Sequence, residues 1–236
     1  MTYLEFLIIF LVTPILVLSF FLKRKSSSDF QILGAWREIG VLSLLAIAYT
    51  TPWDNYLVKM KVWWYSEDRV LGTIGYVPIE EYSFFVLQTI LSSLFCLSLQ
   101  KRFSLNRIPY PTPLDIRRKG KITILYTLVF LLGILCLFSD SSTYMGLILI
   151  WSMPIVLVQW LIGGHYLLRN AKLVFLSIAA PTLYLWGADS LAIALKIWEI
   201  SPKYTTGIHL GNLPVEEAVF FLVTNFMVIQ GFILFR

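Results

Sequence analysis

Long apolar runs follow one another along almost the whole chain, and they limit what it can fold into. A membrane-spanning helix needs about 20 mostly apolar residues. Apolar residues make up 58% of the 236 residues and charged residues 14%, whereas soluble domains are about 45–50% apolar. We therefore expect an all-α integral membrane protein with about seven transmembrane helices, and exclude a soluble enzyme and a nucleic-acid-binding protein. The expected spans lie near residues 2–22, 38–58, 78–100, 122–138, 144–162, 174–196 and 214–235.

The basic residues predict how these helices are oriented. Cytoplasmic loops of membrane proteins carry an excess of Lys and Arg. With the N-terminus outside, fourteen of the nineteen basic residues fall on the cytoplasmic side. We therefore expect an N-out, C-in protein of the cell membrane. We interpret the basic run at residues 117–121 as a topology signal on a cytoplasmic loop rather than as a lipid-binding site.

An eleven-residue segment occurs twice in the chain. Residues 75–85, GYVPIEEYSFF, reappear as residues 211–221, GNLPVEEAVFF, at an offset of 136. Upstream, the pairs Asp54/Asp189 and Trp63/Trp198 recur at an offset of 135. Further back, Pro14 and Pro154 correspond at an offset of 140. Self-similarity of this kind indicates an internal repeat.

The repeat predicts the domain organisation. We expect a first three-helix repeat over residues 1–104, a basic loop and linker helix over 105–140, and a second three-helix repeat over 141–236. Four membrane crossings separate equivalent helices, so the two repeats run parallel, an arrangement known among membrane proteins. Both copies of the repeated segment then reach the same surface of the membrane.

Each copy of the segment carries two glutamates where a helix is expected to begin: Glu80 and Glu81, then Glu216 and Glu217. Acidic residues stabilise the first turn of a helix, which would explain a single pair. Ionisable side chains at membrane depth are costly, however, and they mark functional sites. Because the pair occurs twice and both copies face one surface, we predict that the four carboxyl groups converge on one cavity and act in acid–base catalysis.

Further candidates lie next to these pairs. Asp54 and Asp189 lie near the ends of the preceding spans, and we include them among the catalytic candidates; an ion pair with Arg69 or Lys196 is the structural alternative. Aromatic side chains beside acids in a dry pocket stabilise a carbocation by about 2 kcal/mol, although membrane aromatics also serve in interfacial belts and in packing. The expected substrate-binding aromatics are Trp63, Trp64, Phe84, Phe85, Trp198, Phe220 and Phe221.

Other kinds of chemistry lack their motifs in this sequence. Its two cysteines and two histidines show no zinc-ligand spacing. No glycine-rich loop for a dinucleotide or phosphate is present, and no Asp-rich pair that would hold magnesium and a diphosphate. We therefore expect no metal and no cofactor.

The repeated segments resemble those of the heterodimer-type membrane lycopene cyclases, here with both halves fused in one chain. The resemblance rests on residues 78–81 with Phe84-Phe85 and Gln88, and on residues 214–217 with Phe220-Phe221 and Thr224-Asn225, and it extends from Pro14 to Gly231. Residues 51–55 and 63–65 are similar as well. The second half departs from the first by carrying residues 187–190, GADS, in place of Trp-Asp-Asn.

The resemblance implies a lycopene β-cyclase activity, the closure of the acyclic ends of lycopene into β-ionone rings. A carboxylic acid would protonate the terminal alkene, an internal alkene would close the ring, and a carboxylate would remove a proton. The resemblance also implies that lycopene arrives from the lipid and that the protein associates with other enzymes of carotenoid synthesis. Two other functions stay open on the residues alone: a carotenoid prenyltransferase, and a small transporter without enzymatic activity.

Overall fold

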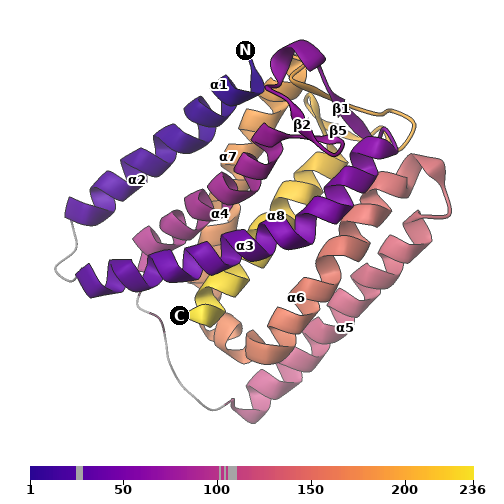
Figure 1. The fold of residues 1–236 in the computed structure, drawn as a ribbon. Helices are drawn as coiled ribbons and strands as arrows, with labels where there is room; N and C mark the ends of the chain where they lie inside the picture. Colours follow the sequence, from indigo (N-terminus) through magenta and orange to yellow (C-terminus); the bar gives the residue numbers. More distant parts are fainter. Residues whose placement is uncertain (25–28, 101, 104, 106–110) are drawn as a thin grey trace.

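The computed structural model describes residues 1–24, 29–100, 102–103, 105 and 111–236, which form a bundle of long helices capped at one end by short strands (Figure 1). The first helix is interrupted by a π-helical turn at Ile8–Val12. The helices are α1 (Tyr3–Leu7), α2 (Thr13–Arg24), α3 (Asp29–Lys59), α4 (Ile79–Gln100), α5 (Pro113–Cys136), α6 (Thr143–Arg169), α7 (Ala171–Ala194) and α8 (Val215–Phe235).

The described helices confirm the expected fold class. Six of them, counting Tyr3–Arg24 as one, are long and apolar enough to cross a membrane. The predicted second span lies within α3, which is 31 residues long. The chain is therefore an all-α membrane protein.

The linker helix begins earlier than the sequence predicted. The expected start was residue 122, but α5 starts at Pro113, so that the basic residues 117–121 are helical and not part of a loop. The cause is a capping box at the N-terminus. The Thr112 hydroxyl accepts a hydrogen bond from the Asp115 amide, and the Asp115 carboxylate accepts one from the Thr112 amide. Asp115 also forms an ion pair with Arg169 of α6 at 2.5 Å.

The connection between the fifth and sixth spans is shorter than expected. α6 continues past residue 162 to Arg169, and Asn170 alone separates it from α7. A kink at Gly163, where the backbone leaves helical geometry, lets the helix continue in a new direction.

Helices α3 and α7 end in the same way. In each, a lysine adopts a left-handed backbone conformation, Lys61 with φ 55° and Lys196 with φ 54°. The next amide reaches back to a carbonyl five residues earlier, Val62 to Leu57 and Ile197 to Ala192, each at 3.0 Å. These are Schellman caps, in which glycine is the usual left-handed residue.

Short strands follow both caps. β1 (Trp63–Tyr65) pairs antiparallel with β4 (Trp198–Ile200), Trp64 lying opposite Glu199. Two hairpins then lead into α4 and α8: β2 (Thr73–Ile74) with β3 (Val77–Pro78), and β5 (His209–Leu210) with β6 (Leu213–Pro214). Each two-residue turn starts with a left-handed glycine, Gly75 or Gly211, as tight hairpin turns require.

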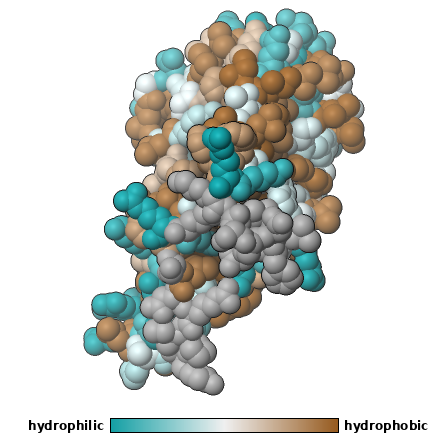
Figure 2. All heavy atoms as spheres, turned by 90° about the vertical axis from the view of Figure 1, so that its left-hand side faces the viewer, coloured by the Kyte–Doolittle hydropathy of each residue, from teal (hydrophilic) through white to brown (hydrophobic). Residues whose placement is uncertain are grey.

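The hairpins and the starts of α4 and α8 lie at one end of the bundle, with the N-terminus, and the C-terminus lies toward the other end (Figure 1). We call the end that carries the hairpins and the N-terminus the hairpin end. α4 and α8 pack against each other and against α7 in the middle, whereas α5 packs chiefly on α6 at the edge. Figure 2 views the side where α2 ends and α3 begins: hydrophilic side chains gather in the middle and lower parts, and hydrophobic ones cover much of the upper part.

Candidate active site

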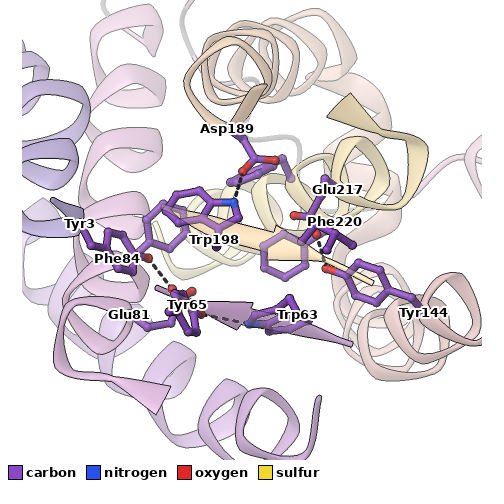
Figure 3. A pocket seen from close by; sticks show the side chains of 12 residues that line it. Tyr3, Trp63, Tyr65, Glu81, Phe84, Tyr144, Asp189, Trp198, Glu217 and Phe220 are labelled. Carbon is purple, nitrogen blue, oxygen red and sulfur yellow. Dashed lines mark hydrogen bonds between the residues drawn. The ribbon is translucent and has the colours of Figure 1, made fainter. Parts of the chain in front are cut away.

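A narrow cavity of about 40 Å³ lies at the hairpin end between the two halves of the chain (Figure 3). Helices α1, α4, α6, α7 and α8 and strands β1 and β4 contribute to its wall. Its lining combines three carboxyl groups with aromatic side chains: Tyr3, Trp63, Tyr65, Glu81, Phe84, Tyr144, Asp189, Trp198, Ile200, Glu217, Phe220 and Phe221.

Glu81, in the first turn of α4, faces this cavity and is held by two tyrosines. Tyr3 of α1 and Tyr65 of β1 both donate hydrogen bonds to its Oε2, the second at 3.0 Å. Burial, and then the neighbouring Glu81 carboxyl, raise the pKa of Tyr65 well above its usual range. Tyr65 therefore remains a phenol and keeps its donor.

Glu217 occupies the equivalent place in α8 and also faces the cavity. Its Oε1 accepts a hydrogen bond of 2.6 Å from Tyr144 at the start of α6. Figure 3 shows Glu81 and Glu217 on opposite sides of the cavity, with Trp198 and Phe220 between them. The predicted convergence of the two halves is thus present for the second glutamate of each pair.

The first glutamate of each pair points elsewhere. Glu80 Oε1 accepts the backbone amide of Leu71 at 2.7 Å, and Glu216 Oε1 accepts the amide and hydroxyl of Thr206 at 2.7 and 2.8 Å. Both side chains are buried, yet neither lines the cavity. They tie the loops before the hairpins to the helices.

The two aspartates are buried beside the cavity. Asp189 lines it, and its Oδ1 accepts the Trp198 indole N–H at 2.8 Å. Asp54 is 1% exposed and does not line the cavity. Its Oδ2 has no hydrogen-bond partner among the described residues. The expected alternative, an ion pair with Arg69 or Lys196, is absent among the described contacts of either aspartate.

Five of the seven predicted aromatic side chains line the cavity: Trp63, Phe84, Trp198, Phe220 and Phe221. Phe85 instead lines a neighbouring groove. Trp64 is 37% exposed and lies opposite Glu199 in the strand pair. The reason is the alternation of side chains along a strand, which turns Trp63 and Tyr65 to one face and Trp64 to the other.

The sequence prediction missed the residues that hold the glutamates: Tyr3, Tyr65 and Tyr144. A signal for two of them was present, because Tyr3 and Tyr144 are related by an offset of 141. The offset falls to 140 at Pro14 and Pro154. The π-helical turn at Ile8–Val12 accounts for this difference, since such a turn accommodates one extra residue in a helix.

Among the described residues, no three His, Cys, Asp or Glu side chains gather in a way that could hold a metal ion. The groups able to act in the cavity are carboxyls and phenols, surrounded by aromatic rings. Such an arrangement can move a proton and surround a positive charge.

Comparison with known proteins relates the chain to a family. The lycopene cyclase family model matches residues 1–99 and 141–235. The chain is 41% identical over 198 residues to a lycopene beta-cyclase of Halobacterium salinarum, covering 84% of this chain and 81% of that one. It is 37% identical over 209 residues to a bifunctional lycopene cyclase/phytoene synthase of Arthroderma gypseum, covering 82% of this chain and 35% of the fungal protein. No solved structure matches the chain.

Proposed function

The chain belongs to the lycopene cyclase family and is an enzyme, and from this premise we propose that it is a lycopene β-cyclase that closes the acyclic ends of lycopene into β-ionone rings. The observation that carries the proposal is that Glu81 and Glu217, one from each half, line a single aromatic cavity. Relatives with a lycopene cyclase name support the substrate.

The reaction we propose is an isomerisation by acid and base. A protonated carboxyl of the cavity adds its proton to the terminal alkene, which leaves a tertiary carbocation. The electron pair of an internal alkene forms the new carbon–carbon bond and closes a six-membered ring, moving the positive charge into the ring. A cavity carboxylate removes a ring proton, and the electrons of that C–H bond form the ring alkene. One proton is added and one is lost.

Glu81 and Glu217 carry these proton transfers, and Asp189 and Asp54 complete the acidic group around them. A general acid or base contributes about 10²–10⁴-fold in rate. Glu80 and Glu216, which bind loop amides, support the reaction by positioning α4 and α8.

The aromatic walls protect the carbocation. Trp198 packs edge-on against Tyr3 with ring centroids 5.0 Å apart, and Phe220 against Phe221 at 5.3 Å. Aromatic faces stabilise a desolvated cation by about 2 kcal/mol. The close packing also keeps water out, and water would trap the cation as an alcohol.

We further propose that the two halves are parallel three-helix repeats, residues 1–104 and 141–236, joined by the linker at 105–140, and that the hairpin end faces outward in an N-out, C-in orientation. The β1–β4 pair supports the repeats, because equivalent strands meet antiparallel about Trp64 and Glu199. Labelling Lys203→Cys and Lys23→Cys in intact cells with a membrane-impermeant maleimide tests the orientation. Only Lys203→Cys is expected to react.

Lycopene reaches the cavity from the lipid in this proposal, as its long apolar chain requires. The fungal relatives combine lycopene cyclase and phytoene synthase in one protein. This supports an association of the chain with other enzymes of carotenoid synthesis, which co-purification from a carotenoid-producing cell would test.

Expression in cells that accumulate lycopene tests the activity. The expected product has the mass of lycopene and an absorption spectrum shifted to shorter wavelength. The shift is expected because the double bond of each new ring is twisted out of the plane of the polyene and contributes less to its conjugation. A product that has gained mass would indicate a prenyltransferase. Uptake of an ion or solute with unchanged lycopene would indicate a transporter. Either result contradicts the proposal.

A further inference from the structure

The cavity is too small to contain a long polyene. The cavity volume of about 40 Å³ is far below the volume of a long polyene. A substrate end enters only if side chains move, and the rest of the chain must lie in another part of the protein during the reaction.

A larger groove lies beside the cavity. It encloses about 210 Å³ between α3, α4, α6 and α8. Phe220 lines both spaces and therefore forms their common wall. The groove is lined mainly by apolar side chains, among them Leu42, Leu45, Ala46, Phe85, Met227 and Val228.

The polar side chains of this groove are largely occupied by partners within the protein. Gln88 donates to Thr224 at 2.9 Å, and the Thr224 hydroxyl donates to the Phe220 carbonyl at 2.9 Å. Gln159 donates to the Met227 carbonyl at 2.9 Å. Because these donors already bond to acceptors within the protein and most of the lining is apolar, the groove suits an apolar occupant. Leu45, which lines the groove, is 53% exposed.

The internal repeat supplies a second groove for comparison. It encloses about 490 Å³ between the first helix, α4 and α7. Four residues of its lining are repeat-related to residues of the first groove. At an offset of 135, Ala180 corresponds to Leu45, Pro181 to Ala46 and Tyr184 to Tyr49. At an offset of 136, Met227 of the first groove corresponds to Leu91 of the second. The two tyrosines also make equivalent hydrogen bonds. The Tyr49 hydroxyl donates to the Trp151 carbonyl at 2.7 Å, and the Tyr184 hydroxyl donates to the Phe10 carbonyl at 3.0 Å.

The two grooves differ in their relation to the cavity. The second groove has no lining residue in common with it, whereas the first shares Phe220. Phe220 is stacked on Trp53 at 5.8 Å and lies 6.1 Å from Trp151, so a stack of rings runs from the cavity wall along the first groove. A rotation of the Phe220 side chain would join the two spaces.

We propose that the groove between α3, α4, α6 and α8 binds the linear polyene chain of the substrate while its reacting end lies between Glu81 and Glu217, with Phe220 as the side chain that opens the passage. This inference rests on the proposed function. The occupant is a long methyl-branched polyene that enters from the bilayer. The groove suits it because its lining is mainly apolar and because Phe220 forms a wall common to the groove and the cavity.

Filling each groove at one helix position tests the proposal. Ala46→Phe narrows the first groove, and Ala180→Phe, in the repeat-related groove, is the matched control. For lycopene supplied in detergent micelles, we expect Ala46→Phe to lower kcat/KM about tenfold, mainly through a higher KM. Ala180→Phe should stay within twofold of the parent protein. Thermal unfolding in detergent shows whether both variants remain folded.

A binding measurement separates this inference from the proposed function. In a Glu217→Gln background, lycopene should quench tryptophan fluorescence, and adding Ala46→Phe should weaken that binding about tenfold, whereas adding Ala180→Phe should not. Equal turnover and binding in the Ala46→Phe and parent proteins would mean that only a lipid acyl chain occupies the groove, and would overturn the inference. A parent protein that binds lycopene without cyclising it would overturn the proposed function instead.

Discussion

Tyr65 and Ile200 occupy equivalent positions in the two halves, and of the two side chains only that of Tyr65 can donate a hydrogen bond. In the first half, the Trp63 indole donates to the Tyr65 hydroxyl at 3.0 Å, and Tyr65 donates to Glu81. In the second half, the Trp198 indole donates to Asp189 instead. The two glutamates of the cavity are therefore inequivalent, although the repeat places them symmetrically.

We expect this difference to matter for turnover. Two phenolic donors on Glu81 Oε2 leave its other oxygen to face the substrate. Tyr65→Phe removes one donor, and a hydrogen bond to a charged group contributes about 1.5–3 kcal/mol. We predict a fall in kcat of about tenfold with little change in KM, measured with lycopene in micelles.

Tyr56→Phe is the control for that variant, because Tyr56 is half exposed on α3 and lies outside the cavity. It should retain the parent kcat. An unchanged kcat in Tyr65→Phe, with the protein folded, would contradict a positioning role for Tyr65.

The two members of each glutamate pair should respond differently to the same substitution. Glu81→Gln and Glu217→Gln remove a proton-transferring group from the cavity, so each should lower kcat at least about 100-fold. Glu80→Gln and Glu216→Gln keep a side-chain oxygen for the amides of Leu71 and Thr206. These two should retain activity within about tenfold.

Product formation in lycopene-accumulating cells, normalised to the amount of inserted protein, measures this difference. Glu80→Ala provides the structural comparison, because it removes the acceptor of the Leu71 amide hydrogen bond and should destabilise the protein by about 0.5–1.5 kcal/mol. If Glu80→Gln abolished cyclisation as fully as Glu81→Gln, the separation of the two roles would be wrong.

The convergence of the two halves could be predicted from the sequence, because it follows from the number of membrane spans between the two copies of the repeat. The repeat and the number of spans between its copies place Glu81 and Glu217 at the same end of the bundle, whatever the details of packing. The hydrophobic runs likewise predicted the six described helices that are long and apolar enough to cross a membrane, although the predicted start of α5 was wrong by nine residues.

Which glutamate of each pair faces the cavity could not be predicted. Neighbouring residues on a helix point about 100° apart, and both positions lie in the first turn. The choice depends on the loop before the hairpin, whose Leu71 or Thr206 amide takes the first glutamate. That loop has no periodic pattern, so its path is set by tertiary contacts.

Trp198 holds Asp189 in place, and the substitution Trp198→Phe tests the cost of losing that contact. The variant keeps an aromatic ring but leaves a buried carboxyl without its 2.8 Å donor. We predict destabilisation by about 1–3 kcal/mol, seen as a lower thermal unfolding temperature in detergent. Trp64→Phe, at the exposed neighbouring position, should change stability by less than about 0.5 kcal/mol.

The left-handed lysines at the ends of α3 and α7 offer the last prediction. A residue with a Cβ pays about 1–2 kcal/mol for this conformation, and glycine does not. Lys61→Gly and Lys196→Gly should each stabilise the protein by about 0.5–1 kcal/mol, because part of the gain is offset by the greater freedom of glycine in the unfolded chain. Lys59→Gly, in the last helical turn of α3, should destabilise by about 1 kcal/mol. The unfolding temperatures of the three variants, measured in one detergent, test this prediction. A destabilised Lys61→Gly protein would contradict it and would show that the lysine side chain stabilises the fold by more than its backbone strain costs.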